Sequence, residues 1–183
     1  MSDYVIKEIK PFIYFPEDQN VYLVMVNAFR KPPHFVLNIG GRVYGTGVNG
    51  PTLEDSFERY LAFIRRKEIH TLFFQLKLPA FATLKEIEDK AKEIVLAYPL
   101  VDVGIATCLS PIKDFVREYY QTDTSNVNKI FDLFPKLEEQ ALIENVFQLN
   151  IDRFMINNEV KLKKYSEQDI ADGINKFRKV SLV

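Results

Sequence analysis

Cysteine and histidine are scarce in this chain of 183 residues, which has one cysteine, Cys108, and two histidines, His34 and His70. A single cysteine cannot form a disulfide within the chain, and it excludes a metal site built from several thiolates. The two histidines are not spaced as His-x-x-x-His or as part of a comparable ligand cluster. We therefore expect no bound metal, and we interpret His70, at the start of a predicted strand, as structural.

Long apolar runs and an excess of one charge are also missing. The longest strongly apolar run, residues 21–26, is far shorter than the roughly 20 residues that cross a bilayer, so we expect no membrane span. Lys and Arg number 24 against 25 Asp and Glu, which leaves no field that would hold the protein on nucleic acid. The N-terminus has no basic segment followed by an apolar one, so it does not resemble a secretory signal, and we expect a cytoplasmic protein.

Apolar residues are plentiful, in contrast. They make up 47% of the sequence, with 15 Phe and 9 Tyr, which is enough for one well-packed core in a chain of this length. No repeat or low-complexity linker divides the chain. We therefore expect a single domain over residues 1–183.

The spacing of the apolar residues predicts both strands and helices. Strands are expected at residues 21–26, 35–39, 42–46 and 69–78. Helices are expected to begin at Thr52, Thr83, Ser110 and Ser166, and residues 126–150 read as helical with a break at Pro135. Gly40 and Gly41 suit a tight hairpin turn, and residues 1–20 suit an edge strand or a wrapping arm. This order favours an α+β fold in which an antiparallel sheet or small barrel packs against helices, with extra C-terminal helices.

The glycines of Gly45-Thr46-Gly47-Val48-Asn49-Gly50 have the spacing of a dinucleotide-binding loop, and they lie between an expected strand and an expected helix. That fingerprint also requires an acidic residue at the end of the next strand, where this chain has Gln75-Leu76-Lys77-Leu78-Pro79. The preceding strand is half of a hairpin, whereas the nucleotide fold begins with a central parallel strand. A flexible connection explains these glycines better, so we expect no cofactor and keep nucleotide binding as a further alternative.

Cys108 is the strongest candidate for a catalytic residue because it lies just before an expected helix. Ser110 as the N-cap and Pro111 at the first helical position mark the start of this helix. A thiol near a helix N-terminus meets partial positive charge and backbone N–H groups, which lower its pKa and can hold an oxyanion. His34, at the head of a strand, is the only attractive general base. The alternative is that Cys108 is a small core residue.

The segment Pro33-His34-Phe35-Val36-Leu37-Asn38-Ile39-Gly40-Gly41-Arg42-Val43-Tyr44 is similar to the His-strand and hairpin that open the circularly permuted papain-like hydrolases. The likeness continues through Gly47-Val48, Pro51-Thr52-Leu53-Glu54-Asp55-Ser56-Phe57 and Phe73-Phe74-Gln75-Leu76-Lys77, and then through Cys108 ahead of Asp114-Phe115-Val116. Over residues 21–120 the chain thus resembles the superfamily of NlpC-type and lecithin retinol acyltransferase-like cysteine hydrolases. The resemblance implies a papain-like core, with residues 124–183 as a C-terminal helical extension.

The same resemblance implies a cysteine hydrolase or acyltransferase in which Cys108 is the nucleophile and His34 the general base. Its substrate would be an amide or ester in a small molecule, a peptide or a lipid. Two departures from the family pattern leave an alternative open. Cys108 lies two helical turns before Phe115, and Tyr44-Gly45-Thr46 offers no Glu, His or Asn to orient the histidine. The alternative is a catalytically degenerate scaffold that binds a partner, including a protein partner, through its aromatic-rich C-terminal third.

Overall fold

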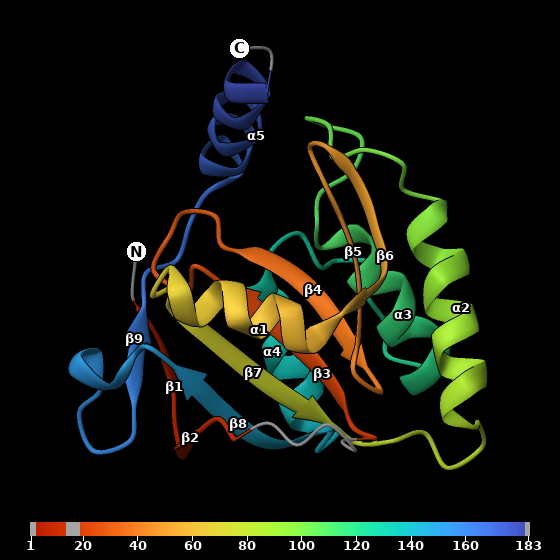
Figure 1. The fold of residues 1–183 in the computed structure, drawn as a ribbon, viewed down its shortest axis with the longest axis horizontal. Helices are drawn as coiled ribbons and strands as arrows, with labels where there is room; N and C mark the ends of the chain where they lie inside the picture. Colours follow the sequence, from red (N-terminus) through yellow and green to blue (C-terminus); the bar gives the residue numbers. More distant parts are fainter. Residues whose placement is uncertain (1–2, 14–18, 182–183) are drawn as a thin grey trace.

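A seven-stranded sheet forms the centre of the structure, a computed structural model that describes residues 3–13 and 19–181 (Figure 1). Its strands are β2 (Ile9–Pro11), β3 (Val21–Val26), β4 (His34–Ile39), β5 (Arg42–Gly47), β6 (Gly50–Ser56), β7 (Thr71–Leu76) and β8 (Ile143–Leu149). The spatial order is β2-β8-β7-β3-β4-β5-β6, and neighbours are antiparallel except for the parallel pair β2 and β8. A separate antiparallel pair joins β1 (Tyr4–Ile6) to β9 (Val160–Leu162).

Helices of the described residues complete the fold. They are α1 (Phe57–Arg66), α2 (Leu84–Leu96), α3 (Ser110–Tyr120), α4 (Ile130–Glu139), the 3-10 helix η1 (Asp152–Phe154) and α5 (Glu167–Ser181). The expected α+β class is confirmed, and the sheet is antiparallel apart from one pair of strands. Within residues 3–13 and 19–181, every helix is too short or too polar to cross a membrane.

Both faces of the sheet are covered by helices. On one face, Phe57 and Leu61 of α1 pack in a cluster with Val36 of β4. On the other face, Ile112 of α3 and Phe134 of α4 belong to a larger cluster that also includes residues of α2. Figure 1 shows α1 in front of the sheet and α4 behind it. Because both faces are covered, β3 is buried at all six positions instead of alternating between apolar and polar residues.

Some of the expected elements form where the sequence predicts them. Residues 21–26 are a strand, and the turn between β4 and β5 has positive φ angles at Gly40 (54°) and Gly41 (83°). The helix after Thr83 also forms. It has the predicted capping box, in which Thr83 and Glu86 bond reciprocally.

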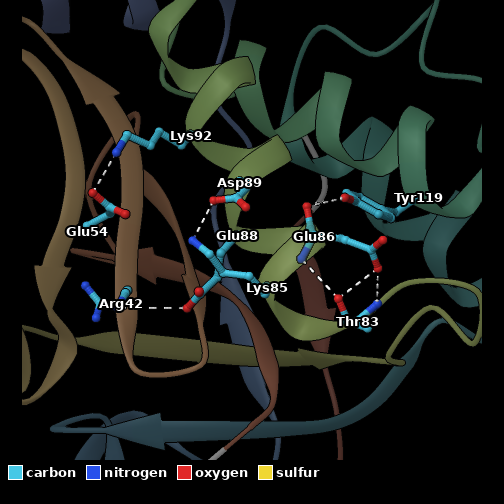
Figure 2. A network of polar contacts seen from close by, with 9 residues as sticks. All are labelled: Arg42, Glu54, Thr83, Lys85, Glu86, Glu88, Asp89, Lys92 and Tyr119. Carbon is cyan, nitrogen blue, oxygen red and sulfur yellow. Dashed lines mark hydrogen bonds and ion pairs between the residues drawn. The ribbon is translucent and has the colours of Figure 1, made fainter.

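Contacts of α2 connect the β5–β6 hairpin to α3 (Figure 2). Lys92 of α2 forms an ion pair of 2.8 Å with Glu54 of β6. From α3, the hydroxyl of Tyr119 donates a hydrogen bond of 3.0 Å to the backbone oxygen of Glu86 in α2. α2 therefore contacts both the hairpin and α3.

The helix expected from Thr52 begins later than predicted. Residues 50–56 form β6, which pairs with β5, and α1 begins at Phe57 with Ser56 as its N-cap. The turn at residues 47–50 sends the chain back along β5, so strand pairing prevails over the helical spacing of the first apolar residues.

Residues 124–183 are not the helical extension that the resemblance implies. The stretch 126–150 is helical over α4 and then forms β8, which lies inside the sheet between β2 and β7. Pro135 lies within α4 and does not end it. The apolar spacing of a short strand can resemble that of a helix, which explains the wrong prediction. Phe134 is fully buried, so this part of the chain contributes to the main core.

Replacing Phe134 by Ala tests that contribution. Its ring lies 4.5 Å from that of Phe74 in β7, centroid to centroid. Truncation leaves a cavity between α4 and the sheet, so we expect the free energy of unfolding to fall by about 3–5 kcal/mol in a single urea transition. Phe63→Ala is the control, because this ring of α1 is 45% exposed and its loss should cost less than about 1 kcal/mol. Two separate transitions, or equal losses in both variants, would contradict a shared core.

Candidate active site

The two residues expected to carry catalysis both lie at the start of an element. His34 is the first residue of β4 and pairs with Val26, the last residue of β3. Cys108 lies two residues before Ser110, where α3 begins. Figure 1 shows that β4 begins and β5 ends at the same end of the sheet.

The sulfur of Cys108 reaches the backbone of β4 directly beside His34. It takes part in backbone hydrogen bonds with Phe35 and with Cys108 itself. Phe35 follows His34 in β4, so the sulfur lies near the backbone position next to that of His34. The side chain of Phe35 and Cys108 share the face of α2, α3 and α4, whereas alternation places the His34 ring on the face of α1. The remainder of Cys108 is partly buried against the cluster formed by α2, α3 and α4.

A divergence of β4 and β5 makes this approach possible. The pairing register of the two strands starts at Leu37 of β4 and leaves Phe35 outside it. At the corresponding end of β5, the hydroxyl of Thr46 donates a hydrogen bond of 2.7 Å to the backbone oxygen of Tyr98. The end of β5 is thus drawn toward the segment that precedes α3. The backbone of Phe35 remains available to Cys108.

Burial raises the pKa of Cys108 to about 11, and the backbone hydrogen bonds oppose this shift only in part. The expectation that the start of the helix would lower this pKa is therefore wrong for the structure as it stands. A thiolate needs either water or strong donors, and the partial charge at a helix terminus does not replace the water lost on burial. At neutral pH Cys108 is a thiol.

The start of α3 uses most of its own N–H groups. The N-cap is Leu109, one residue before the predicted Ser110. The N–H of Leu109 donates to the hydroxyl of Thr107 at 3.2 Å, and the N–H of Ser110 donates to the backbone oxygen of Thr107 at 3.0 Å. Two of the groups expected to hold an oxyanion are therefore already bonded. The N–H of Cys108 is directed to its own sulfur.

His34 is held neutral as well. Burial, with a smaller contribution from the positive charge of Arg30, lowers its pKa to about 4. A neutral imidazole can accept a proton, but both causes disfavour the imidazolium that would result. Transfer of a proton from Cys108 to His34 is therefore uphill in this structure.

No side chain of β5 orients the imidazole. If the register that pairs Leu37 with Tyr44 is continued toward the start of β4, Gly47 lies opposite His34. Gly45 is the next residue of β5 on the same face. Neither glycine has a side chain to offer. Tyr44 points to the opposite face and packs in the cluster under α2, α3 and α4.

Two tyrosines lie within electrostatic range of Cys108. Burial and then the charge of a Cys108 thiolate raise the pKa of Tyr60 to about 12, and the same thiolate charge helps to raise the pKa of Tyr165. Tyr60 belongs to α1, on the face where alternation along β4 also places His34. Cys108 is therefore close to groups from both faces of the sheet. Nothing in the local sequence indicates either tyrosine, because their position depends on how the helices cross the sheet.

The glycine segment 45–50 is part of an antiparallel hairpin. Gly47 and Gly50 pair with each other across the turn between β5 and β6. A dinucleotide loop instead leads from a parallel strand directly into a helix whose N-terminus holds the phosphates. This geometry contradicts the nucleotide-binding alternative.

His70 packs among aromatic rings, as its structural interpretation requires. Its ring centroid lies 5.3 Å from that of Phe29 and 4.8 Å from that of Phe154. Among the described residues, no group of three or more His, Cys, Asp or Glu side chains could hold a metal ion.

Comparison of the chain with protein-family models, with curated proteins and with solved structures finds no match. The site itself has three features that bear on function: the contact between Cys108 and β4, the partly buried His34 and the divergence of β4 from β5.

Replacing His34 by Gln tests whether the imidazole is held neutral. The pKa is about 4 in the folded chain against an ordinary value of 6.5, so the unfolded chain binds a proton more readily between these limits. Stability therefore falls as the pH is lowered through this window. Urea denaturation should show the parent protein losing up to about 1.4 kcal/mol per pH unit more than His34→Gln. His70→Gln, the control at the other histidine, should keep the part of the loss that comes from His34, and because burial also lowers the pKa of His70 its slope should lie only somewhat below that of the parent. Equal slopes in the parent and His34→Gln would contradict a neutral imidazole.

Proposed function

We propose that this chain is a cysteine hydrolase or acyltransferase acting on an amide or ester bond, with Cys108 as nucleophile and His34 as general base. The observation that carries the proposal is the approach of the Cys108 sulfur to the backbone of Phe35, the residue after His34 in β4. This approach brings the one thiol of the sequence to the start of the strand that His34 heads, while alternation along β4 places the partly buried imidazole on the face of α1. A nucleophile and a base from distant parts of the chain at one end of a sheet are the minimum that acyl transfer requires.

Because the thiol and the imidazole are both neutral, the proton is transferred during the attack of the sulfur and not before it. His34 removes the thiol proton while the sulfur attacks the carbonyl carbon, so no thiolate needs to exist beforehand. The N–H of Cys108, which is directed to its own sulfur in the resting structure, turns to the oxyanion of the tetrahedral intermediate. His34 then passes the proton to the departing amine or alcohol, which leaves a thioester on Cys108. Water or an acceptor nucleophile, deprotonated by His34, attacks the thioester and restores the thiol.

A permuted papain-like arrangement fits the order of elements. A strand headed by His34 is followed by a hairpin, by the buried strand β7 and then by a helix just after Cys108. The resemblance drawn from the sequence implies the same order. The substrate class that it suggests is an amide or ester in a small molecule, a peptide or a lipid. The finer family assignment rests on this order and on the proximity of Cys108 to β4.

A catalytically degenerate scaffold that binds a partner is the second candidate. Two observations favour it. β5 presents only glycine next to His34, and in triad enzymes the loss of the orienting group lowers the rate by orders of magnitude. Burial also raises the pKa of the Cys108 thiol and lowers that of the His34 imidazole, which is the wrong direction for a preformed ion pair.

Acetyl transfer from p-nitrophenyl acetate distinguishes the two candidates. An enzyme should release p-nitrophenol in a burst equal to the protein concentration, and mass spectrometry should find the acetyl group on the peptide that contains Cys108. Cys108→Ala should abolish both signals. His34→Gln keeps the thiol and removes the base, so the burst rate should fall by about a hundredfold or more.

His70→Gln is the matched control, because it changes the other histidine of the chain in the same way. It should retain the burst. Acetylation of Cys108 at equal rates in the parent protein and in His34→Gln would mean that the imidazole is not a base. That result would overturn the enzyme proposal and favour the binding scaffold.

A further inference from the structure

α5 connects the loop that leads into β4 with the loop that leads toward α3. The ring centroid of Phe177 lies 4.0 Å from the guanidinium carbon of Arg30, in the first of these loops. Nη2 of Arg178 lies 3.0 Å from Oδ1 of Asp102, in the second loop, and donates a hydrogen bond of 3.1 Å to the backbone oxygen of Val101. The two loops that end at His34 and at Cys108 are thus held by adjacent residues of one helix.

α5 lies beyond the end of the sheet and does not cover either of its faces (Figure 1). Its contact with the rest of the molecule is a narrow stripe. Ile174 is 5% exposed, but Phe177, one turn further along the same stripe, is 40% exposed. At Gly173 the helix passes so close to the first loop that an added Cβ would lie 2.9 Å from Cδ of Pro32.

The two ends of α5 are attached differently. At its start, Ser166 and Asp169 bond reciprocally, with distances of 2.7 Å and 3.1 Å between backbone nitrogen and side-chain oxygen. Tyr165, directly before, is 3% exposed and belongs to the main core. Toward the other end, the attachments include the cation–π contact of Phe177 and the ion pair and hydrogen bond of the partly exposed Arg178. Such contacts are individually weak, so this end can separate while the core stays folded.

We propose that α5 is a lid over the site of Cys108 and His34, hinged near Ser166 and latched by Phe177 and Arg178. The purpose of the lid rests on the proposed function, whereas its closure rests on the contacts of α5 alone. In the closed state, which the structure represents, the thiol and the imidazole are only partly exposed, and α5 restricts access to them. Release of the latch admits water and substrate.

Alkylation of Cys108 by N-ethylmaleimide measures lid opening without requiring catalysis, because the chain has one thiol. The full chain is treated with excess reagent at pH 8, and the rate is compared with that of the urea-unfolded protein. In the double variant Phe177→Ala, Arg178→Ala, alkylation should be about tenfold faster or more than in the parent protein. A rate within about twofold of the parent would overturn the lid.

Lys92→Ala is the matched control. It breaks the Lys92–Glu54 ion pair, whose side chains are 41% and 36% exposed, whereas those of Arg178 and Asp102 are 39% and 38% exposed. The two variants lose equivalent surface pairs, but only one pair lies on the latch. Lys92→Ala should leave the alkylation rate unchanged, and an increase equal to that of the latch variant would show general loosening and overturn the proposal.

A charge exchange provides a second test that does not depend on lost packing. Asp102→Arg places two cations at the latch and should accelerate alkylation. Adding Arg178→Asp restores an ion pair of opposite polarity and should return the rate to near that of the parent. If the exchanged pair reacts as fast as Asp102→Arg alone, the latch is refuted.

Failure of the lid and failure of the proposed function have different signatures. A lid over a site without catalysis gives faster alkylation in the latch variants, but no His34-dependent acetylation in any variant. A catalytic site without a lid gives His34-dependent acetylation, while the latch variants are alkylated at the rate of the parent.

Discussion

Both faces of β7, β3 and β4 are covered by helices, and the rest of the structure depends on this constraint. β3 is buried at every position, so the chain must supply an apolar layer on each side. α1 provides one layer, and α2, α3 and α4 provide the other. The start of β4 lies between these layers, where His34 is partly buried and Phe35 fully buried. The burial that stabilises the fold therefore also sets the chemistry of His34 and Cys108, since it holds both groups neutral.

The divergence of β4 and β5 makes the backbone of Phe35 accessible to Cys108, but it also leaves the imidazole of His34 without an orienting side chain from β5. A continued ladder would occupy the backbone of Phe35, whereas the divergence leaves it to the Cys108 sulfur. The strand that turns away has only glycine at the positions nearest His34. The charge that acts on the imidazole is the cation of Arg30, and its effect is opposite to that of the carboxylate found in many triads. The start of β4 thus brings Cys108 near the strand of His34 without electrostatic preparation for proton transfer.

Features of the fold that depend on residues close together in sequence could be predicted, whereas features that depend on distant residues could not. The Gly40–Gly41 turn and the capping box at Thr83 are set by neighbours in sequence, and both were predictable. The position of β8 depends on β2 and β7 from distant parts of the chain, so its apolar spacing was misread as helical. Cys108 before a helix and His34 before a strand were visible as candidates. The direction in which the pKa of the thiol shifts could not be predicted from the sequence, because the burial of a sulfur atom is a tertiary property.

The cause of the two pKa shifts connects the closed site to its proposed chemistry. For both Cys108 and His34 the first cause is burial, and the charge of Arg30 adds only to the second. A shift caused by burial reverses when water enters, whereas one caused by a fixed charge largely persists. Hydration would therefore lower the pKa of the thiol and raise that of the imidazole together. A single movement of α5 would thus act on both partners of the proton transfer in the direction that favours it.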